Sequence, residues 1–192
     1  MQAMPTEKTP LLLAPTPMDR IRRIANLMRG MVVIGGTVFV ASTLFLWFSH
    51  QWVEIVAMRD VGVDAASISL TPAAQWVSAL AALVPLSVGV FGMFQVWKLF
   101  GDYAQGQIFT SQASTRLRRL AWSLIVCAAA QVLARTATSL ALTFNNPPGK
   151  KMLIVNISST DYTFVLFGVL LLGIAWVMVE ATRLAQENAE FI

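Results

Sequence analysis

Four long apolar runs set the limits on what this chain of 192 residues folds into. They lie at about 31–52, 75–99, 120–143 and 162–182. Each is close to or above the ~20 residues that an α-helix needs to cross a hydrocarbon core of ~30 Å. The sequence therefore predicts an all-α membrane protein that folds as a bundle of four transmembrane helices.

The composition and the short connections leave no room for a separate soluble domain. Hydrophobic residues make up 56% of the chain and charged residues 12%, against about 25% charged in a soluble domain. Residues 1–18 contain four prolines, which predicts a disordered, Pro-rich tail. Residues 19–192 then form one four-helix transmembrane domain, and the stretch DRIRRIANLMRG at its start predicts an N-terminal amphipathic helix at the membrane surface.

The basic residues predict the topology, because cytoplasmic ends of transmembrane helices are enriched in Lys and Arg. Three basic residues flank one side of the spans, namely Arg59, Lys150 and Lys151. Nine flank the other side, namely Arg20, Arg22, Arg23, Arg29, Lys98, Arg116, Arg118, Arg119 and Arg183. Both termini and residues 100–119 are expected in the cytoplasm. The connections 53–74 and 144–161 are expected outside, where the β-prone runs ASISLTP and MLIVNISS predict a small extracytoplasmic β-ribbon.

Catalytic and metal-binding groups are scarce. The chain has one cysteine, Cys127, and one histidine, His50, and no acidic cluster inside the spans. Neither a zinc site nor a Cys-His nucleophile can be assembled from these residues within one chain. We expect no enzyme activity, cofactor or metal. Direct nucleic-acid binding is not expected either, because the basic residues follow the topology and form no aromatic-interleaved surface.

The polar stretch LFGDYAQGQIFTSQASTRLRRLAW, residues 99–122, predicts a tight helical hairpin. Gly106 ends the first helix, Thr110 or Ser111 caps the next, and a stub of about 10 Å projects into the cytoplasm. Two interpretations remain: the arginines meet lipid phosphates, or the tip docks a protein. The candidate contact residues are Tyr103, Gly106, Phe109, Arg116, Arg118 and Arg119.

The third apolar run contains a polar stripe. Gln131, Arg135 and Ser139 are spaced four residues apart, with Thr138 on the same helical face. An arginine near the bilayer centre costs at least ~2.5 kcal/mol, so the stripe is expected to face the bundle and find a partner there. The candidates for that partner are Asp161, Glu54, or carbonyl and hydroxyl groups of the helix core. Arg135 then either snorkels outward as an anchor or contacts an anion or substrate in a cavity.

Small residues predict which spans pack together. Ser78 and Ala82 are four apart in the second span, and Ala81, Pro85 and Gly89 form another such row. Ala130, Ala134 and Thr138 form a similar stripe in the third span. Small residues at this spacing allow close helix approach, so the second span is expected to pack on the third.

The hairpin also carries a family resemblance. Its pattern F..Y..G.IFT......LR.L.W, the C-terminal stretch GIAWVMVEATRLAQENAEFI and the basic start DRIRRIANLMRGM resemble the bacterial membrane-protein family known as domain of unknown function 2975, from about residue 19 to 192. The resemblance implies four transmembrane helices in the bacterial inner membrane and no established activity. Members are often encoded beside a small helix-turn-helix regulator, which implies a cytoplasmic protein partner.

Two functional hypotheses follow. The leading one is an interaction or regulatory membrane protein that presents the cytoplasmic hairpin and the C-terminal helix extension to a protein partner. The alternative is a small transporter or channel component, in which Pro85, Gln131 and Arg135 would be the working residues. Beyond the lipid bilayer and such a partner, the sequence leaves self-association into a homo-oligomer open.

Overall fold

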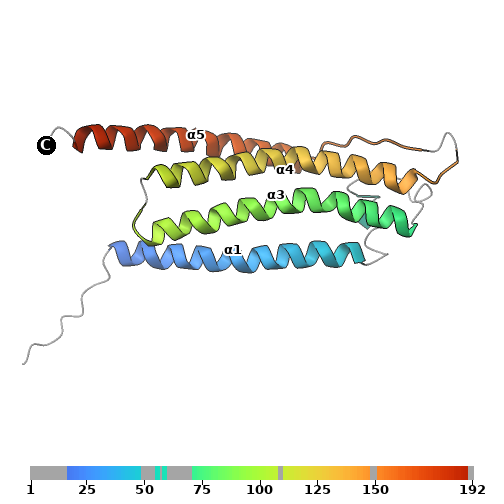
Figure 1. Cartoon of the computed structure of the whole chain (residues 1–192), viewed down its shortest axis with the longest axis horizontal. Coiled ribbons are helices and arrows are strands. Elements are labelled where there is room, and N and C mark those ends of the chain that lie inside the picture. The colour runs from blue at the N-terminus through green and yellow to red at the C-terminus, as the bar shows by residue number, and fades with distance from the viewer. Residues whose placement is uncertain are drawn as a thin grey trace, which may run out of the picture.

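The computed structural model describes residues 17–48, 55–56, 58–59, 71–107, 110–147 and 151–189. Within them it has four long helices: α1 (Pro17–Phe48), α3 (Pro72–Ala104), α4 (Ser111–Thr143) and α5 (Ser159–Ala189). They lie side by side along one axis (Figure 1). Each is long and apolar enough to cross a membrane, so the predicted all-α arrangement of four membrane-spanning helices is confirmed.

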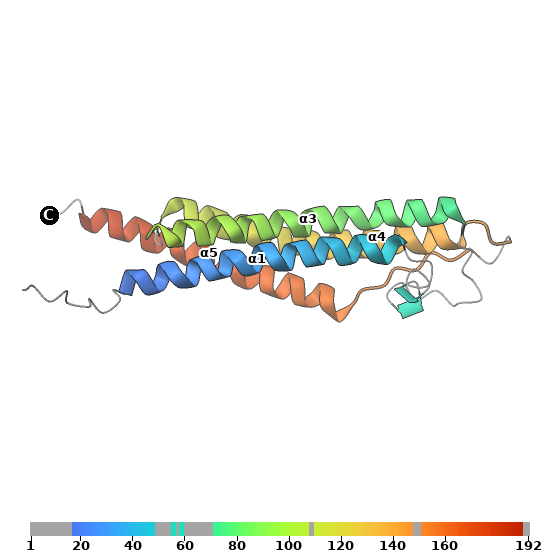
Figure 2. The same ribbon diagram turned by 90° about the horizontal axis from the view of Figure 1, so that it is seen from below.

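The helices pack in a row. α3 packs on α1 and on α4, and α5 packs on α4. α1 and α5 make no extensive contact with each other in the described part of the chain. α5 runs obliquely to the other three helices (Figure 2). Each outer helix therefore has one main neighbour, and α3 and α4 form the centre.

Local sequence signals account for the helix starts. The side chain of Thr71 accepts a hydrogen bond from the amide of Ala74 at 3.2 Å, and Pro72 opens α3. Thr110 caps α4 in the same way through the amide of Ala113, also at 3.2 Å. Both caps satisfy amides that have no partner inside the helix. Of the two caps that the sequence offered for α4, Thr110 is the one used.

The N-terminal amphipathic helix is not a separate element, which corrects the sequence-based expectation. α1 runs without a break from Pro17 to Phe48 and so includes both the basic segment and the first span. The physical reason is the absence of proline after position 17 in this helix, so the backbone hydrogen bonding has no cause to stop. The helix begins at Pro17, and residues 1–16, most of the predicted tail, lie outside the described residues.

The predicted β-ribbon is not supported. Residues 151–158 form a stretched trace without regular secondary structure (Figure 1), and no strand is present in the described ranges. Most of the other predicted run, its residues 66–70, lies outside them. The extended segment binds instead to side chains of α4, as described below. Its β-prone residues predicted a strand because such residues favour an extended backbone, whether that backbone binds to a sheet or to a helix.

Small residues let α4 approach both of its neighbours. Ser78 of α3 and Ala130 and Thr138 of α4 are buried, which agrees with the predicted packing of the second span on the third. A Cβ added at Gly92 would lie 2.6 Å from the Ser123 hydroxyl. On the other side of α4, a Cβ added at Gly168 would lie 2.6 Å from Ile125 Cγ1 and 2.9 Å from the carbonyl oxygen of Ala121.

We predict that Gly168→Ala destabilises the protein by about 1–3 kcal/mol, because the new methyl group meets backbone as well as a side chain. Gly173→Ala is the matched control on the same helix, since a Cβ there has nothing within 4 Å. Denaturant titration of both variants in mild detergent checks this. Equal stability of the two variants would contradict the close approach of α5 to α4.

Candidate functional site

Residues 151–158 form an extended segment that binds along one end of α4. We call this segment the strap, and we call this end of the bundle the strap end. The hydroxyl of Thr143 lies 3.1 Å from both the amide nitrogen and the carbonyl oxygen of Met152. Ser139 accepts from the amide of Ile154 at 3.2 Å, and Arg135 donates to the carbonyl oxygen of Asn156 at 3.3 Å. Side chains of α4 thus form the hydrogen bonds to the strap backbone that a neighbouring strand forms in a sheet.

The spacing explains why the two segments stay in register. Successive contacts are two residues apart in the strap and four apart in α4. Two extended residues rise ~6.6 Å, and four helical residues rise ~6.0 Å. The polar stripe predicted in the third span therefore has a structural role at Arg135 and Ser139.

Arg135 also forms an ion pair with Asp161 at the start of α5. The side chains are 13% and 5% exposed. The same oxygen of Asp161 accepts from the amide of Ser158 at 2.7 Å, while the Ser158 hydroxyl accepts from the amide of Thr160 at 3.2 Å. Ser158 and Asp161 form a capping box that starts α5. Asp161 was one of the two partners predicted for Arg135, and the pairing is confirmed; Glu54 lies outside the described residues.

The third residue of the predicted stripe has a different environment. Gln131 lies one turn from Arg135 and lines two neighbouring cavities between the helices. The Nε atom of Arg135 and the Oδ1 atom of Asp161 are buried without a hydrogen-bond partner in the described structure. The ion pair thus contains one donor and one acceptor without a partner, and Arg135 also lines one of the cavities. Buried polar groups normally have a hydrogen-bond partner.

The opposite end, which we call the hairpin end, is the turn between α3 and α4. Gly106 has a φ of +80°, and the amides of Gly106 and Gln107 donate to the carbonyl oxygens of Tyr103 and Asp102. This pattern is a Schellman motif, which needs a residue that tolerates positive φ. The predicted helix end at Gly106 is confirmed.

A second ion pair fastens this hairpin. Arg116 lies 2.5 Å from Asp102 and donates to the carbonyl oxygen of Lys98 at 2.7 Å, so it ties the second turn of α4 to the end of α3. Asp102 was not among the predicted contact residues, although it is the single acid within a motif that contains three arginines. Arg116 therefore has a partner inside the protein.

The other predicted contact residues of the hairpin separate into three groups. Tyr103 stacks edge-on against Phe100 at 5.9 Å and packs on a buried cluster that includes Leu117, so it is part of the core. Arg118 and Arg119 are exposed and line a groove with Phe91 and Trp122. Those two aromatic side chains are about half exposed, which places the arginines where basic side chains meet lipid headgroups. Phe109 lies outside the described residues.

A sequence model of the family described as Protein of unknown function (DUF2975) matches residues 62–192, which is more than half of the chain. The chain belongs to this family. The match covers α3, the hairpin, α4, the strap and α5, and it begins after α1. The resemblance predicted from residue 19 is thus confirmed from residue 62 onward. No curated protein and no solved structure matches the chain.

The DUF2975 region contains all the polar contacts described above at both ends of the bundle. In the described ranges there is no group of three or more His, Cys, Asp or Glu side chains that could hold a metal ion. The described residues form one ion pair between helices at each end of the bundle: Arg116–Asp102 at the hairpin end and Arg135–Asp161 at the strap end.

We predict that Arg135→Leu destabilises the protein by about 3 kcal/mol or more, because Asp161 is left buried and unpaired. Adding Asp161→Asn should restore part of that loss, since the amide oxygen can still cap α5 without a buried charge. The exposed pair of Arg183 with Glu180 offers a control, and Arg183→Leu should cost no more than about 1 kcal/mol. Unfolding in mild detergent measures all three; a double variant less stable than Arg135→Leu would contradict the pairing.

Proposed function

We propose that this multi-pass membrane protein acts without catalysis, as an interaction protein of the bacterial inner membrane that presents its hairpin end to a cytoplasmic protein partner. The observation that carries the proposal is a polar end of the bundle whose two helices are tied together. The end of α3 is held by a Schellman motif, and the Arg116–Asp102 pair joins it to α4. Beside it, α5 continues past the turn to Ala189 (Figure 1). A preorganised surface loses little conformational entropy when a partner binds.

The positive-inside rule supports placing this end in the cytoplasm. Arg20, Arg22 and Arg23 at the start of α1 lie at the same end as the hairpin, because Met18 lies against Gly106. The hairpin adds Arg118 and Arg119. The opposite end of the bundle is poorer in basic residues, and Lys and Arg favour the cytoplasmic side.

The surface offered to a partner is the tip of the hairpin together with the α5 extension. Gln105, Gln107 and Gln112 are exposed at the tip. On α5, Arg183 pairs with Glu180 and Glu187 along the helix surface, at 3.1 and 3.2 Å. The position of Arg118 and Arg119 beside exposed aromatic side chains favours a lipid contact for these two. The family resemblance suggests the partner: a small helix-turn-helix regulator.

The transporter or channel alternative draws on one observation: Pro85 and Gln131 line two adjacent cavities, and Arg135 lines one of them. The lining nearer the hairpin end includes Met93, Val96 and Leu120, beside Ser123, whose hydroxyl donates to the carbonyl oxygen of Leu120. A mainly apolar lining of this kind favours a hydrophobic guest over an ion or a hydrophilic solute. The interaction role is therefore the better supported of the two.

The topology is tested by single cysteines. In a Cys127→Ser background, Ser67→Cys and Gly149→Cys should react with an impermeant maleimide in intact cells, whereas Gln107→Cys should react only after the membrane is opened. This outcome follows from the positive-inside distribution. Labelling of Gln107→Cys in intact cells would reverse the orientation and remove the docking surface from the cytoplasm.

Docking is tested by a photo-crosslinking residue at position 107, with position 133 as control because Leu133 is 70% exposed on the helix surface. We expect a cytoplasmic helix-turn-helix protein to crosslink at 107 and only lipid at 133, as identified by mass spectrometry. Gly106→Val should reduce the crosslink, because a β-branched residue at positive φ costs about 1–2 kcal/mol. The same products at both positions would contradict docking at the hairpin tip.

A further inference from the structure

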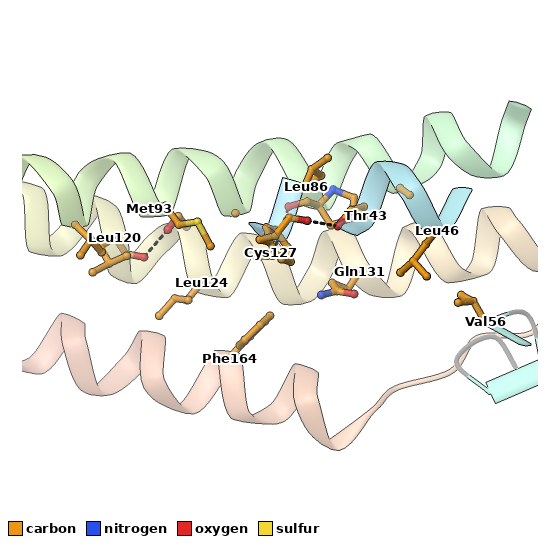
Figure 3. Close-up of a pocket in the computed structure, with 17 residues that line it drawn as sticks. Thr43, Leu46, Val56, Leu86, Met93, Leu120, Leu124, Cys127, Gln131 and Phe164 are labelled. Atoms are coloured by element: carbon orange, nitrogen blue, oxygen red, sulfur yellow. Dashed lines mark hydrogen bonds between the residues drawn. The ribbon is translucent and has the colours of Figure 1, made fainter. Parts of the chain in front are cut away.

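A cleft opens between α1 and α5, over the faces of α3 and α4. A cavity of about 590 Å³ is lined by residues from all four helices (Figure 3). Its walls are mainly apolar and include Leu46 of α1, Met93 of α3, Leu124 of α4 and Phe164 of α5. The volume falls within the ~300–1,000 Å³ of ordinary ligand sites. The cleft exists because α1 and α5 each pack extensively on only one neighbour.

The cleft becomes polar and cationic toward the strap end. A second cavity of about 330 Å³ shares Val56, Ala82, Pro85 and Gln131 with the first, so the two are adjacent. Its remaining lining is largely polar and consists of Arg59, Ala134, Arg135, Thr138, Asn156, Ser158 and Thr160. One cleft thus combines a long apolar part with a basic end. These two parts complement the hydrocarbon tail and the anionic head of an amphiphile.

Arg135 is held in place at the polar end. Its Nη2 donates to Asp161 and to the carbonyl oxygen of Asn156. Its Nε is buried without a partner in the described structure, so a ligand meets the part of this side chain that stays exposed to the cavity, 13% of its surface. Ser158 and Thr160 line the same end and supply polar groups for a head that carries hydroxyls.

We propose that this cleft binds one anionic phospholipid. The phosphodiester lies at Arg59 and Arg135, the head-group hydroxyls lie against the polar lining at Ser158 and Thr160, and a hydrocarbon chain follows the apolar walls toward Met93. Arg59 and Arg135 are the charged residues of the described lining at this end, and their positive charge complements a phosphodiester. The observations behind this proposal are separate from those behind the docking proposed for the opposite end.

The length of the cleft agrees with a lipid tail. On α3 its lining extends from Ala82 to Val96, about 21 Å at 1.5 Å per residue. Half of a ~30 Å hydrocarbon core is about 15 Å. The apolar walls therefore accommodate a chain that spans one leaflet, and a free phosphate or sugar phosphate would leave them empty.

The test is native mass spectrometry of the purified full-length protein in mild detergent, with phosphatidylglycerol as the probe. We expect one retained phosphatidylglycerol per chain and about tenfold less phosphatidylcholine, a ratio that corresponds to ~1.4 kcal/mol. Free glycerol phosphate at the same concentration should not displace the lipid. Equal retention of both lipids, displacement by glycerol phosphate, or a lipid-free dimer would overturn the proposal.

Variants locate the lipid in the cleft without touching the Arg135–Asp161 pair. Arg59 is exposed and lines the polar cavity but not the apolar one. Arg59→Gln should therefore lower retention of phosphatidylglycerol by about tenfold and leave the fold intact. Leu124→Trp should fill the apolar part and lower retention similarly. Leu133→Trp is the matched control on the outer surface of the same helix. Unchanged retention in both cleft variants, with unchanged melting, would place the lipid elsewhere and refute the assignment.

Discussion

The described structure depends on the ability of α4 to bind three different segments at once. α3 packs on one face, α5 on another, and the strap binds along its end by hydrogen bonds to Ser139 and Thr143. Such crowding requires small side chains, and Ala113, Ala121 and Ser139 have no exposed surface. In a membrane, where helix association gains little from burying apolar surface away from lipid, close van der Waals packing and interhelical hydrogen bonds supply the stability.

The buried charges follow from the same constraint, because a charge in hydrocarbon is tolerated only with a partner or near the interface. Arg119 and Arg135 lie about 24 Å apart along α4 at 1.5 Å per residue, and Asp161 and Glu180 lie about 28 Å apart along α5. Both separations are close to the ~30 Å of a hydrocarbon core. The Arg135–Asp161 pair thus belongs at a border of the membrane, rather than deep within it as the apolar run 120–143 suggested. The outer turns of α3 and α4, with the strap, extend beyond that border.

The sequence predicted the features that local chemistry determines. The spans and the helix end at Gly106 followed from hydropathy and capping preferences. For the cap of α4 and for the partner of Arg135, the sequence offered alternatives that included Thr110 and Asp161. The continuity of α1 and the binding mode of the strap did not follow. An amphipathic segment has the same pattern whether it lies on the membrane or continues into a span, and β-prone residues favour an extended chain without showing what that chain binds. Asp102 was missed since nothing local shows that an acid on one helix meets Arg116 on the next.

The open arrangement of the helices connects the two ends of the molecule. α3 and α4 form a fixed pair through close packing and the Arg116–Asp102 pair. α1 and α5 are each held mainly on one side, and the cleft between them extends from the strap end toward the hairpin end. A ligand shifts a conformational equilibrium only by the difference in its affinity for the two states. A lipid in the cleft would contact α1 and α5 together, so its affinity must depend on their separation. Because α5 continues past the hairpin turn, the position of this helix is the physical link between occupancy of the cleft and the surface at the hairpin end.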